Sequence, residues 1–150
     1  GAIGAATILA FAGAIYPAAP TAQAEKAPIY TGVFDNYAAG GYDVVSYFTE
    51  GRAIEGASSY QTEYQGADFY FSSQANLNAF LADPAKYAPQ YGGYCAYAMA
   101  QGAKAKTDPE AFSIVDGSLY LNYSLGVRER WNADQVTYIK QADENWPSVR

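Results

Sequence analysis

The sequence predicts an α+β fold, in which a small antiparallel sheet of two hairpins packs against several short helices. Two pairs of short aromatic and β-branched runs flank the turn dipeptides Gln65-Gly66 and Asp116-Gly117. Each pair is followed by apolar residues at helical spacing. Half of the 150 residues are hydrophobic and 16% are charged, a composition typical of a globular domain with one core.

The first 24 residues form an uncharged N-terminal segment with two interpretations. Gly1–Tyr16 is a small and apolar run, and Pro17 and Pro20 interrupt it before an Ala-Gln-Ala ending at residue 24. This pattern is typical of a secretory signal peptide cleaved after Ala24. The alternative is a retained membrane-anchor helix, although sixteen helical residues span roughly 24 Å of a hydrocarbon core of about 30 Å. Both interpretations place the domain outside the cytoplasm.

Residues 25–40 are expected to form a linker, and residues 41–150 the domain. Tyr42–Phe48 is β-branched and aromatic, so it predicts a strand or a short turn of helix. Gly51 and Gly56 then predict a loop.

The first hairpin is predicted from Ser59–Glu63 and Ala67–Ser72. Because side chains alternate along a strand, Tyr70 should face one side of the sheet, with Phe69 and Phe71 on the other. A helix over residues 74–82 should follow, capped by Ser72 or Ser73 and closed by Asp83-Pro84, with a short turn to Tyr87. Its core face is expected to hold Leu77, Phe80 and Leu81.

The second half repeats this order of elements. Tyr94–Gln101 is rich in alanine and predicts a helix that Gly102 closes. Lys104–Glu110 is expected to be a polar loop, and Phe112–Val115 and Ser118–Tyr123 to be the strands of the second hairpin.

Two helices are predicted after the second hairpin. The first covers Ser124–Trp131, and the second is capped by Asn132 or Asp134 and stops at Asn145, before Trp146-Pro147. Residues Val136, Ile139 and Tyr138 should face the core. Apart from the shared order of hairpin and helix, the two units show no common residue pattern.

Charge and composition argue against several functions. The net charge is −6, the pI is about 4.4 and no basic run occurs, so nucleic-acid binding is not expected. The sequence contains no histidine, the commonest general base and metal ligand. It also lacks a Gly-rich phosphate loop and a serine-nucleophile elbow. We therefore expect a protein that is not an enzyme.

Several motifs resemble a known family. Residues 64–73 read Tyr-x-Gly-x-x-Phe-Tyr-Phe-x-Ser, and Asn76, Phe80, Asp83-Pro84 and Tyr87 follow. This pattern resembles the YHS domain. A fuller set resembles the exported, single-domain YHS proteins of Gram-negative bacteria, over about residues 41–147. The resemblance implies a periplasmic protein, either soluble after signal cleavage or tethered to the inner membrane. The motifs of the fuller set are residues 41–48, 89–96, 114–123 and 145–147.

The resemblance implies little about chemistry. YHS domains elsewhere accompany copper-transporting ATPases and some oxygenases, where paired cysteines suggest metal binding. Here Ser72 and Ser73 stand at the first of those cysteines, and Asn76 stands near the second. The histidine in the family's name is absent as well, so a tetrahedral thiolate site cannot be carried over.

Cys95 and Met99 form the candidate metal site. They lie four residues apart on a predicted helix, so both sulfurs could face one side and bind Cu(I), which makes copper the candidate cofactor. The alternative is that both side chains are core residues. Cys95 as a nucleophile is the least favoured interpretation, since no histidine can act as its base.

Four tyrosines surround this cysteine in the sequence. They could line a ligand or partner surface, or pack in a half-buried seam between sheet and helices with their hydroxyls bonded to the backbone. These residues are Tyr87, Tyr91, Tyr94 and Tyr97.

Two functions are consistent with these observations. The first is a non-enzymatic binding or accessory module, in one version a membrane-anchored subunit of a larger membrane complex. The second is a metal or small-ligand binding protein that uses Cys95 and Met99.

Overall fold

The computed structural model describes residues 28–150 and confirms the α+β class. The predicted signal peptide or anchor, with its apolar helix, lies outside the described residues. Within residues 28–150, no helix combines the length and the apolar character needed to cross a membrane.

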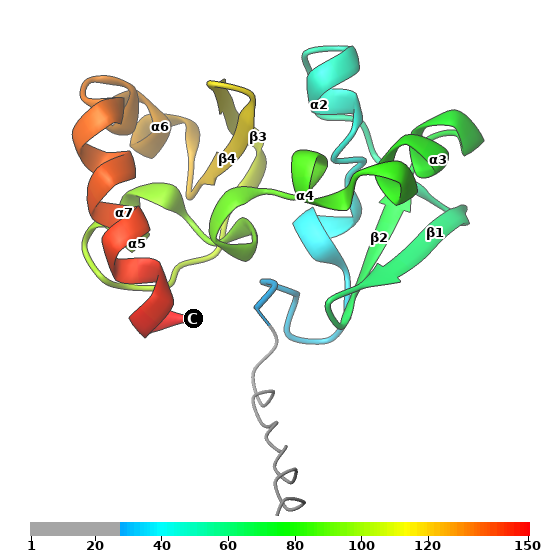
Figure 1. Cartoon of the computed structure of the whole chain (residues 1–150), viewed down its shortest axis with the longest axis horizontal. Helices are drawn as coiled ribbons and strands as arrows, with labels where there is room; N and C mark the ends of the chain where they lie inside the picture. The colour runs from blue at the N-terminus through cyan, green and yellow to red at the C-terminus, as the bar shows by residue number, and fades with distance from the viewer. Residues whose placement is uncertain (1–27) are drawn as a thin grey trace, which may run out of the picture.

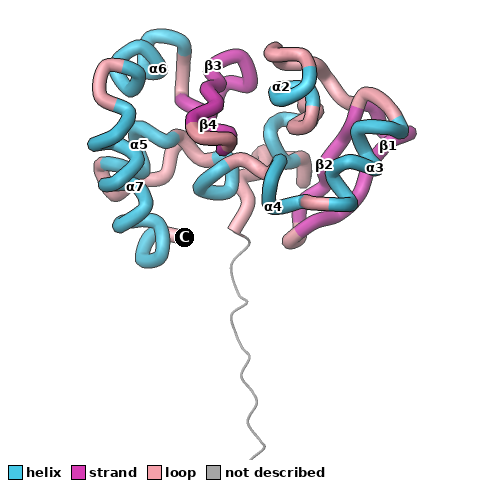
Figure 2. The backbone as a smooth tube through the Cα atoms, turned by 45° about the horizontal axis from the view of Figure 1, so that its top comes forward, coloured by secondary structure: helices cyan, strands magenta, loops and turns pink. Residues whose placement is uncertain are grey.

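The chain forms two halves that lie side by side (Figure 1). Each half contains a 3-10 turn, a short helix, a hairpin and then further helix (Figure 2). The first half consists of η2 (Ala38–Gly41), α2 (Ser46–Thr49), β1 (Ala57–Tyr64), β2 (Ala67–Phe71), α3 (Gln74–Ala82) and α4 (Pro84–Tyr87). The second consists of η3 (Gln90–Gly93), α5 (Ala96–Ala100), β3 (Asp108–Val115), β4 (Ser118–Asn122), α6 (Leu125–Asn132) and α7 (Gln135–Val149).

The two hairpins make two separate two-stranded sheets. In β1–β2 the pair Tyr64–Ala67 closes the turn, and in β3–β4 the pair Val115–Ser118 does so. Both ladders contain an irregularity at the same place, in the first half of the longer strand. An isolated two-stranded sheet is marginally stable in water, so each hairpin depends on the helices packed against it.

Aromatic rings fill the core of the first half. Phe69 and Phe71 are buried while Tyr70 is half-buried, which confirms the predicted alternation. Phe80 of α3 stacks on Phe69 with ring centroids 4.8 Å apart. Leu81 is 54% exposed, so its predicted core position is wrong. It follows Phe80 directly and is turned about 100° around the helix from that buried face.

The core of the second half is built around Trp131 and Met99, which are both fully buried. Helix α7 contributes the buried Ala142 and the partly buried Tyr138 and Ile139. Val136 is 80% exposed, so its predicted core position is also wrong. The face of α7 that carries Ala142 meets the core, and Val136 lies off that face.

Three predicted boundaries in the second half also need correction. Helix α5 begins at Ala96, because Cys95 is its N-cap and not a helical residue. The expected loop over residues 104–110 ends early, because Asp108 already pairs with Asn122. Helix α7 continues through Pro147. A proline removes one donor and crowds the preceding turn, which costs less in this last turn than in a helix interior.

The two halves also repeat each other's backbone. Gly-Gly-Tyr occurs at residues 40–42 and again at 92–94. Ala39 and Tyr91, at the same place before each tyrosine, are both left-handed, with φ of 52° and 58°. The amide of the residue after each tyrosine then donates to a corresponding carbonyl, Asp43 to Ile54 at 2.8 Å and Cys95 to Ala105 at 3.0 Å.

The repeat continues to the helix after each hairpin. Both hairpin turns, residues 65–66 and 116–117, have positive φ angles. Ser73 caps α3 and Ser124 caps α6, each accepting from the backbone three residues on. Asp83 and Asp134 then stand at the N-caps of α4 and α7. The expectation that the halves share no residue pattern is therefore wrong. The shared residues are few and consist of the two Gly-Gly-Tyr sequences, the capping serines and the capping aspartates.

Candidate functional site

Asp43 is the most heavily bonded buried side chain of the first half. Its Oδ1 accepts from the amides of Val45 at 2.9 Å and Ser46 at 3.1 Å. Its Oδ2 accepts from the amide of Ser72 at 2.8 Å, the Ser72 hydroxyl at 2.7 Å and Asn76 Nδ2 at 2.8 Å. The carboxylate is fully buried, and these bonds replace the water it loses.

Asp43, Ser72 and Asn76 form what we name the Asp43 cluster, and Ser72 and Asn76 are the residues that the family resemblance sets against the paired cysteines of metal-type YHS domains. Ser72 and Asn76 both point at the carboxylate, and Ser73 caps α3. The sequence did not indicate this cluster, because its two parts are 29 residues or more apart in the chain. The arrangement fastens α2 to the start of α3.

Cys95 and Met99 both lie in the interior of the second half. Cys95 is 1% exposed, and its Sγ accepts from the Ala98 amide at 3.4 Å as the N-cap of α5. The same Sγ lies 3.5 Å from Asn122 Oδ1, which also accepts from the Tyr97 amide at 2.9 Å. Met99 is fully buried among the aromatic residues of that core.

The copper hypothesis at Cys95 and Met99 stays a prediction. Within residues 28–150, no three side chains of His, Cys, Asp and Glu gather into a metal-binding group. Asn122 is a buried neighbour of Cys95 that the sequence did not indicate. Its Nδ2 has no hydrogen-bond partner among the described residues.

The four candidate tyrosines are not brought together on one surface. Tyr87 packs edge-on against Phe48 in the first half, and Tyr97 packs edge-on against Tyr138 of α7. Tyr94 lies between Tyr30 and Trp146. Three of the four therefore approach α7, and the fourth belongs to the other half.

Tyr91 is the most buried of the four. Its hydroxyl donates to Asp143 Oδ1 at 2.9 Å, which ties η3 to α7. Burial, and then the hydrogen bond to this carboxylate, raise the pKa of Tyr91 well above its ordinary value. Tyr91 is thus a neutral hydrogen-bond donor at physiological pH.

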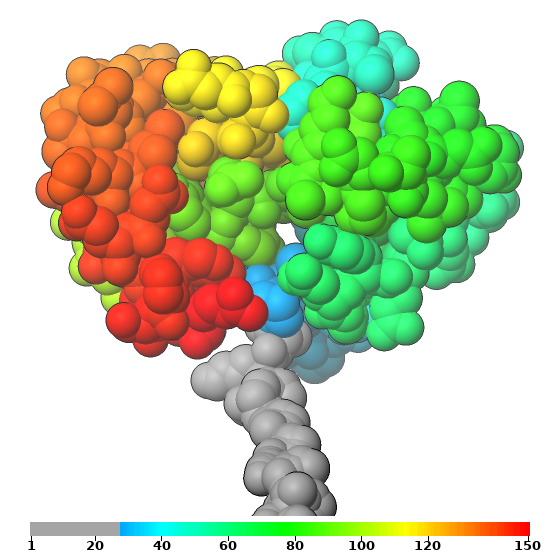
Figure 3. Space-filling view, in the orientation of Figure 1, coloured from blue at the N-terminus to red at the C-terminus, as the bar shows by residue number. Residues whose placement is uncertain are grey.

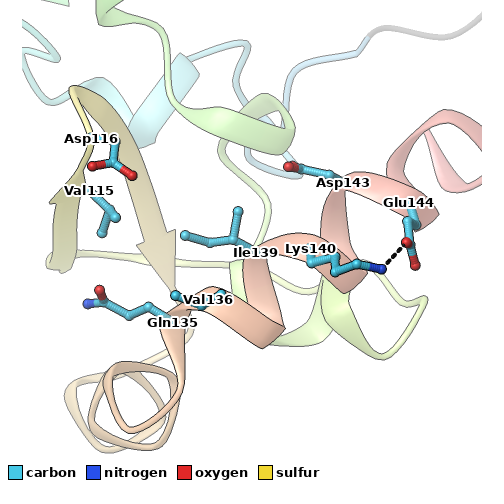
Figure 4. Close-up of a pocket in the computed structure, with 8 residues that line it drawn as sticks. All are labelled: Val115, Asp116, Gln135, Val136, Ile139, Lys140, Asp143 and Glu144. Carbon is cyan, nitrogen blue, oxygen red and sulfur yellow. Dashed lines mark hydrogen bonds and ion pairs between the residues drawn. The ribbon is translucent and has the colours of Figure 1, made fainter.

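A cavity of about 460 Å³ lies between the turn of the β3–β4 hairpin and α7. We name it the α7 groove (Figure 4). Its floor is aliphatic, and Ile139 extends from α7 toward Val115 at the end of β3. The lining residues are Val115, Asp116, Gln135, Val136, Ile139, Lys140, Asp143 and Glu144. Its volume lies in the range of ligand sites, and polar and charged side chains border its aliphatic floor.

The rim of the α7 groove is acidic. It carries the carboxylates of Asp116, Asp143 and Glu144 and the single ammonium group of Lys140. Lys140 Nζ pairs with Glu144 at 2.6 Å, on the outer side of the helix (Figure 4). The rim therefore has an excess of negative charge that favours a cationic ligand group.

A second cavity, of about 240 Å³, lies between the two halves, and we name it the interhalf cavity. Figure 3 shows a hollow there, next to the start of the described chain. Pro28 and Ile29 line one side of it, Tyr64 another, and Trp146 and Arg150 a third. Neither cavity could be predicted from the sequence, because the residues that line each one come from separate segments of the chain.

Comparison with protein families finds a YHS domain at residues 45–91. Neither curated proteins nor solved structures give a match. The matched residues begin at the N-cap of α2 and end in η3, so they cover the β1–β2 hairpin and the Asn76 and Ser72 side of the Asp43 cluster. The match therefore includes most of the first of the two repeated halves.

Proposed function

We propose that this chain is an exported, non-enzymatic YHS protein that acts as a binding or accessory module, as a subunit of a larger membrane complex. The α7 groove carries this proposal. It offers an aliphatic floor, an acidic rim and the 80% exposed side chain of Val136 at its edge. Sites of this form bind through shape and a few placed charges and need no reacting group.

The use of the buried polar groups supports a non-enzymatic role. Acid–base and nucleophilic catalysis need a titratable or nucleophilic group that reaches bound substrate. Both oxygens of Asp43 are occupied by internal donors, and Cys95 caps α5 inside the core. Asp43 and Cys95 therefore both have structural roles.

Composition supports a location in the bacterial envelope. Gly1–Tyr16 is an uninterrupted run of small, apolar and aromatic residues without charge. Such a segment serves either as an export signal or as an anchor. In the anchored form, it would hold the α7 groove within reach of a membrane complex.

Native purification of the full chain from solubilised membranes tests the proposal. We expect wild type to co-migrate with a membrane complex, and Val136→Gln to reduce the co-migrating fraction, because it removes aliphatic surface from the groove. Leu81→Gln is the matched control, since Leu81 is an exposed aliphatic residue of α3 outside the groove. Wild type that never co-migrates, or equal fractions for wild type and Val136→Gln, would contradict the proposal.

A further inference from the structure

The α7 groove and the interhalf cavity occupy equivalent places in the two halves. Each lies between the turn of a hairpin and the helix whose N-cap is an aspartate. Residues 64–65 line the interhalf cavity, and their counterparts 115–116 line the α7 groove. From the helix, Ala85 and Val136 occupy the same position in the two cavities, two residues after the capping aspartate. The lining residues of the two cavities can therefore be compared position by position.

The interhalf cavity is walled by a segment of the chain itself. Pro28 and Ile29 lie along it, outside any helix or strand, and the side chain of Ile29 is 5% exposed. The amide of Tyr30 fastens the segment by donating to the carbonyl of Gly92 at 2.8 Å. A Cβ on Gly92 would lie 1.8 Å from the Pro28 carbonyl oxygen, so the backbones meet closely. The buried side chain of Ile29, this backbone hydrogen bond and the packing of Tyr30 on Tyr94 hold the segment in place.

The α7 groove has no such segment among the described residues. Its lining comes only from the β3–β4 turn and from α7. Helix α7 is long, whereas its counterpart α4 ends at Tyr87 and is followed by η3. Val136 stays exposed there, and Ile139 is only partly covered. Its volume of about 460 Å³ compares with about 240 Å³ for the cavity that the segment walls. The second half thus has the equivalent place with no chain segment along it among the described residues.

The two cavities also differ in charge. The counterparts of Asp116 and Val115 in the interhalf cavity are the neutral Gln65 and Tyr64. In the α7 groove, Asp116 and the α7 carboxylates outnumber the single cation, Lys140. A segment that lies in the groove would therefore be favoured by a lysine or arginine beside its aliphatic residue.

We infer that the α7 groove binds a short segment of a partner protein, with an aliphatic side chain against Val136 and Ile139 and a basic side chain beside Asp116. The inference rests on the proposed binding function and adds the chemical class of the partner. Pro28 and Ile29, which line the equivalent cavity, are the template for the aliphatic part, and the acidic rim defines the basic part. A contact of this size is expected to be weak, with a Kd on the order of 100 μM.

The test uses a synthetic peptide with the Pro-Ile-Tyr sequence of residues 28–30 between two lysines at each end. The peptide is titrated into the ¹⁵N-labelled full chain and followed by NMR. We expect shifts at the amides of Asp116 and Val136, and a weaker affinity at high salt. Val136→Gln should raise the Kd at least about fivefold and Asp116→Asn about threefold, and Leu81→Gln should not change it. Asparagine is chosen because it tolerates the left-handed backbone at residue 116.

Several outcomes would overturn the inference. They are a peptide that causes no shifts at millimolar concentration, shifts confined to residues 64–65 and 85, and an affinity that Val136→Gln leaves unchanged. Sedimentation that shows a dimer of the full chain, lost in Val136→Gln, would assign the groove to a second copy. If the peptide does not bind but co-migration of the full chain still depends on Val136, the aliphatic and basic partner segment is rejected and the proposed binding function stands. A peptide that binds while the full chain never co-migrates would contradict only the accessory role.

Discussion

Asp43 has a structural role that a single substitution can measure. Asp43→Ala removes the acceptor of five hydrogen bonds and leaves donors from Ser72 and Asn76 without a partner. Since bonds to a charged group contribute roughly 1.5–3 kcal/mol each, we expect the free energy of unfolding to fall by about 3 kcal/mol or more. Urea denaturation measures it. Ser72→Ala, which removes only the hydroxyl, should lower the free energy of unfolding by about a third as much. Equal losses for the two variants would contradict the central role of the Asp43 carboxylate in this hydrogen-bond cluster.

Tyr47 and Tyr91 should make the protein sensitive to alkaline pH. Burial is the main cause that raises the pKa of both phenols far above the ordinary 10.0. Above pH 10 the unfolded chain therefore loses protons that the folded chain keeps, so stability is complete below that pH and falls as pH rises. Each tyrosine adds a slope of at most about 1.4 kcal/mol per pH unit.

Denaturation of wild type at pH 8 and at steps from 10 to 11.5 measures the alkaline slope. The double variant Tyr47→Phe, Tyr91→Phe should be less stable at pH 8, since it loses the hydrogen bonds to Pro109 and Asp143. Its slope above pH 10 should be smaller. An unchanged slope would assign the alkaline sensitivity to other groups.

Cys95 should react only when the second half opens. Its sulfur is buried and accepts from the Ala98 amide, so an alkylating reagent cannot reach it in the folded state. We expect iodoacetamide labelling to be slow in buffer and to accelerate through the unfolding transition in urea. A native rate equal to that of the denatured chain would place the thiol at the surface. Copper(I) titration of wild type against Cys95→Ser tests the metal hypothesis, and equal affinities would remove Cys95 from it.

Element η3 holds residues 28–30 in position through Gly92. Gly92 has φ of +63°, and its missing Cβ leaves room for the Pro28 carbonyl. Gly92→Ala should displace residues 28–30, expose Ile29 and lower the free energy of unfolding by about 2–4 kcal/mol. Hydrogen exchange at the Tyr30 amide should accelerate as well. Gly66→Ala is the matched control, because it has φ of +87° with nothing within 4 Å, and it should cost only about 1 kcal/mol.

Local signals account for the elements that the sequence predicts well. The turn at residues 116–117 specifies the second hairpin, and Ser73 and Asp83 bound α3 closely, because each acts on backbone groups within a few residues. Longer-range packing accounts for the errors. Leu81 and Val136 are apolar at plausible helical spacing, yet the neighbouring elements cover other faces of their helices.

At the scale of the whole molecule, the candidate site was the least predictable feature. The sequence directs attention to Cys95 because it is unique, but the fold places it in the interior. The α7 groove forms where a hairpin turn meets α7, and nothing in residues 115–116 or in Val136 alone indicates a cavity. Only the repeat, visible once the halves are compared, relates the α7 groove to the interhalf cavity.

The walls of the interhalf cavity have a consequence for chain connectivity. Pro28 and Arg150 line the same small hollow, so the two ends of the described chain are neighbours (Figure 1). A circular permutant that joins residue 150 to residue 28 by a short Gly-Ser linker and opens at Gly66 should fold, because that turn is exposed and unobstructed. Circular dichroism and the urea midpoint measure the result. A permutant that fails to fold, while the same linker inserted at Gly66 is tolerated, would show that the order of the two halves along the chain matters.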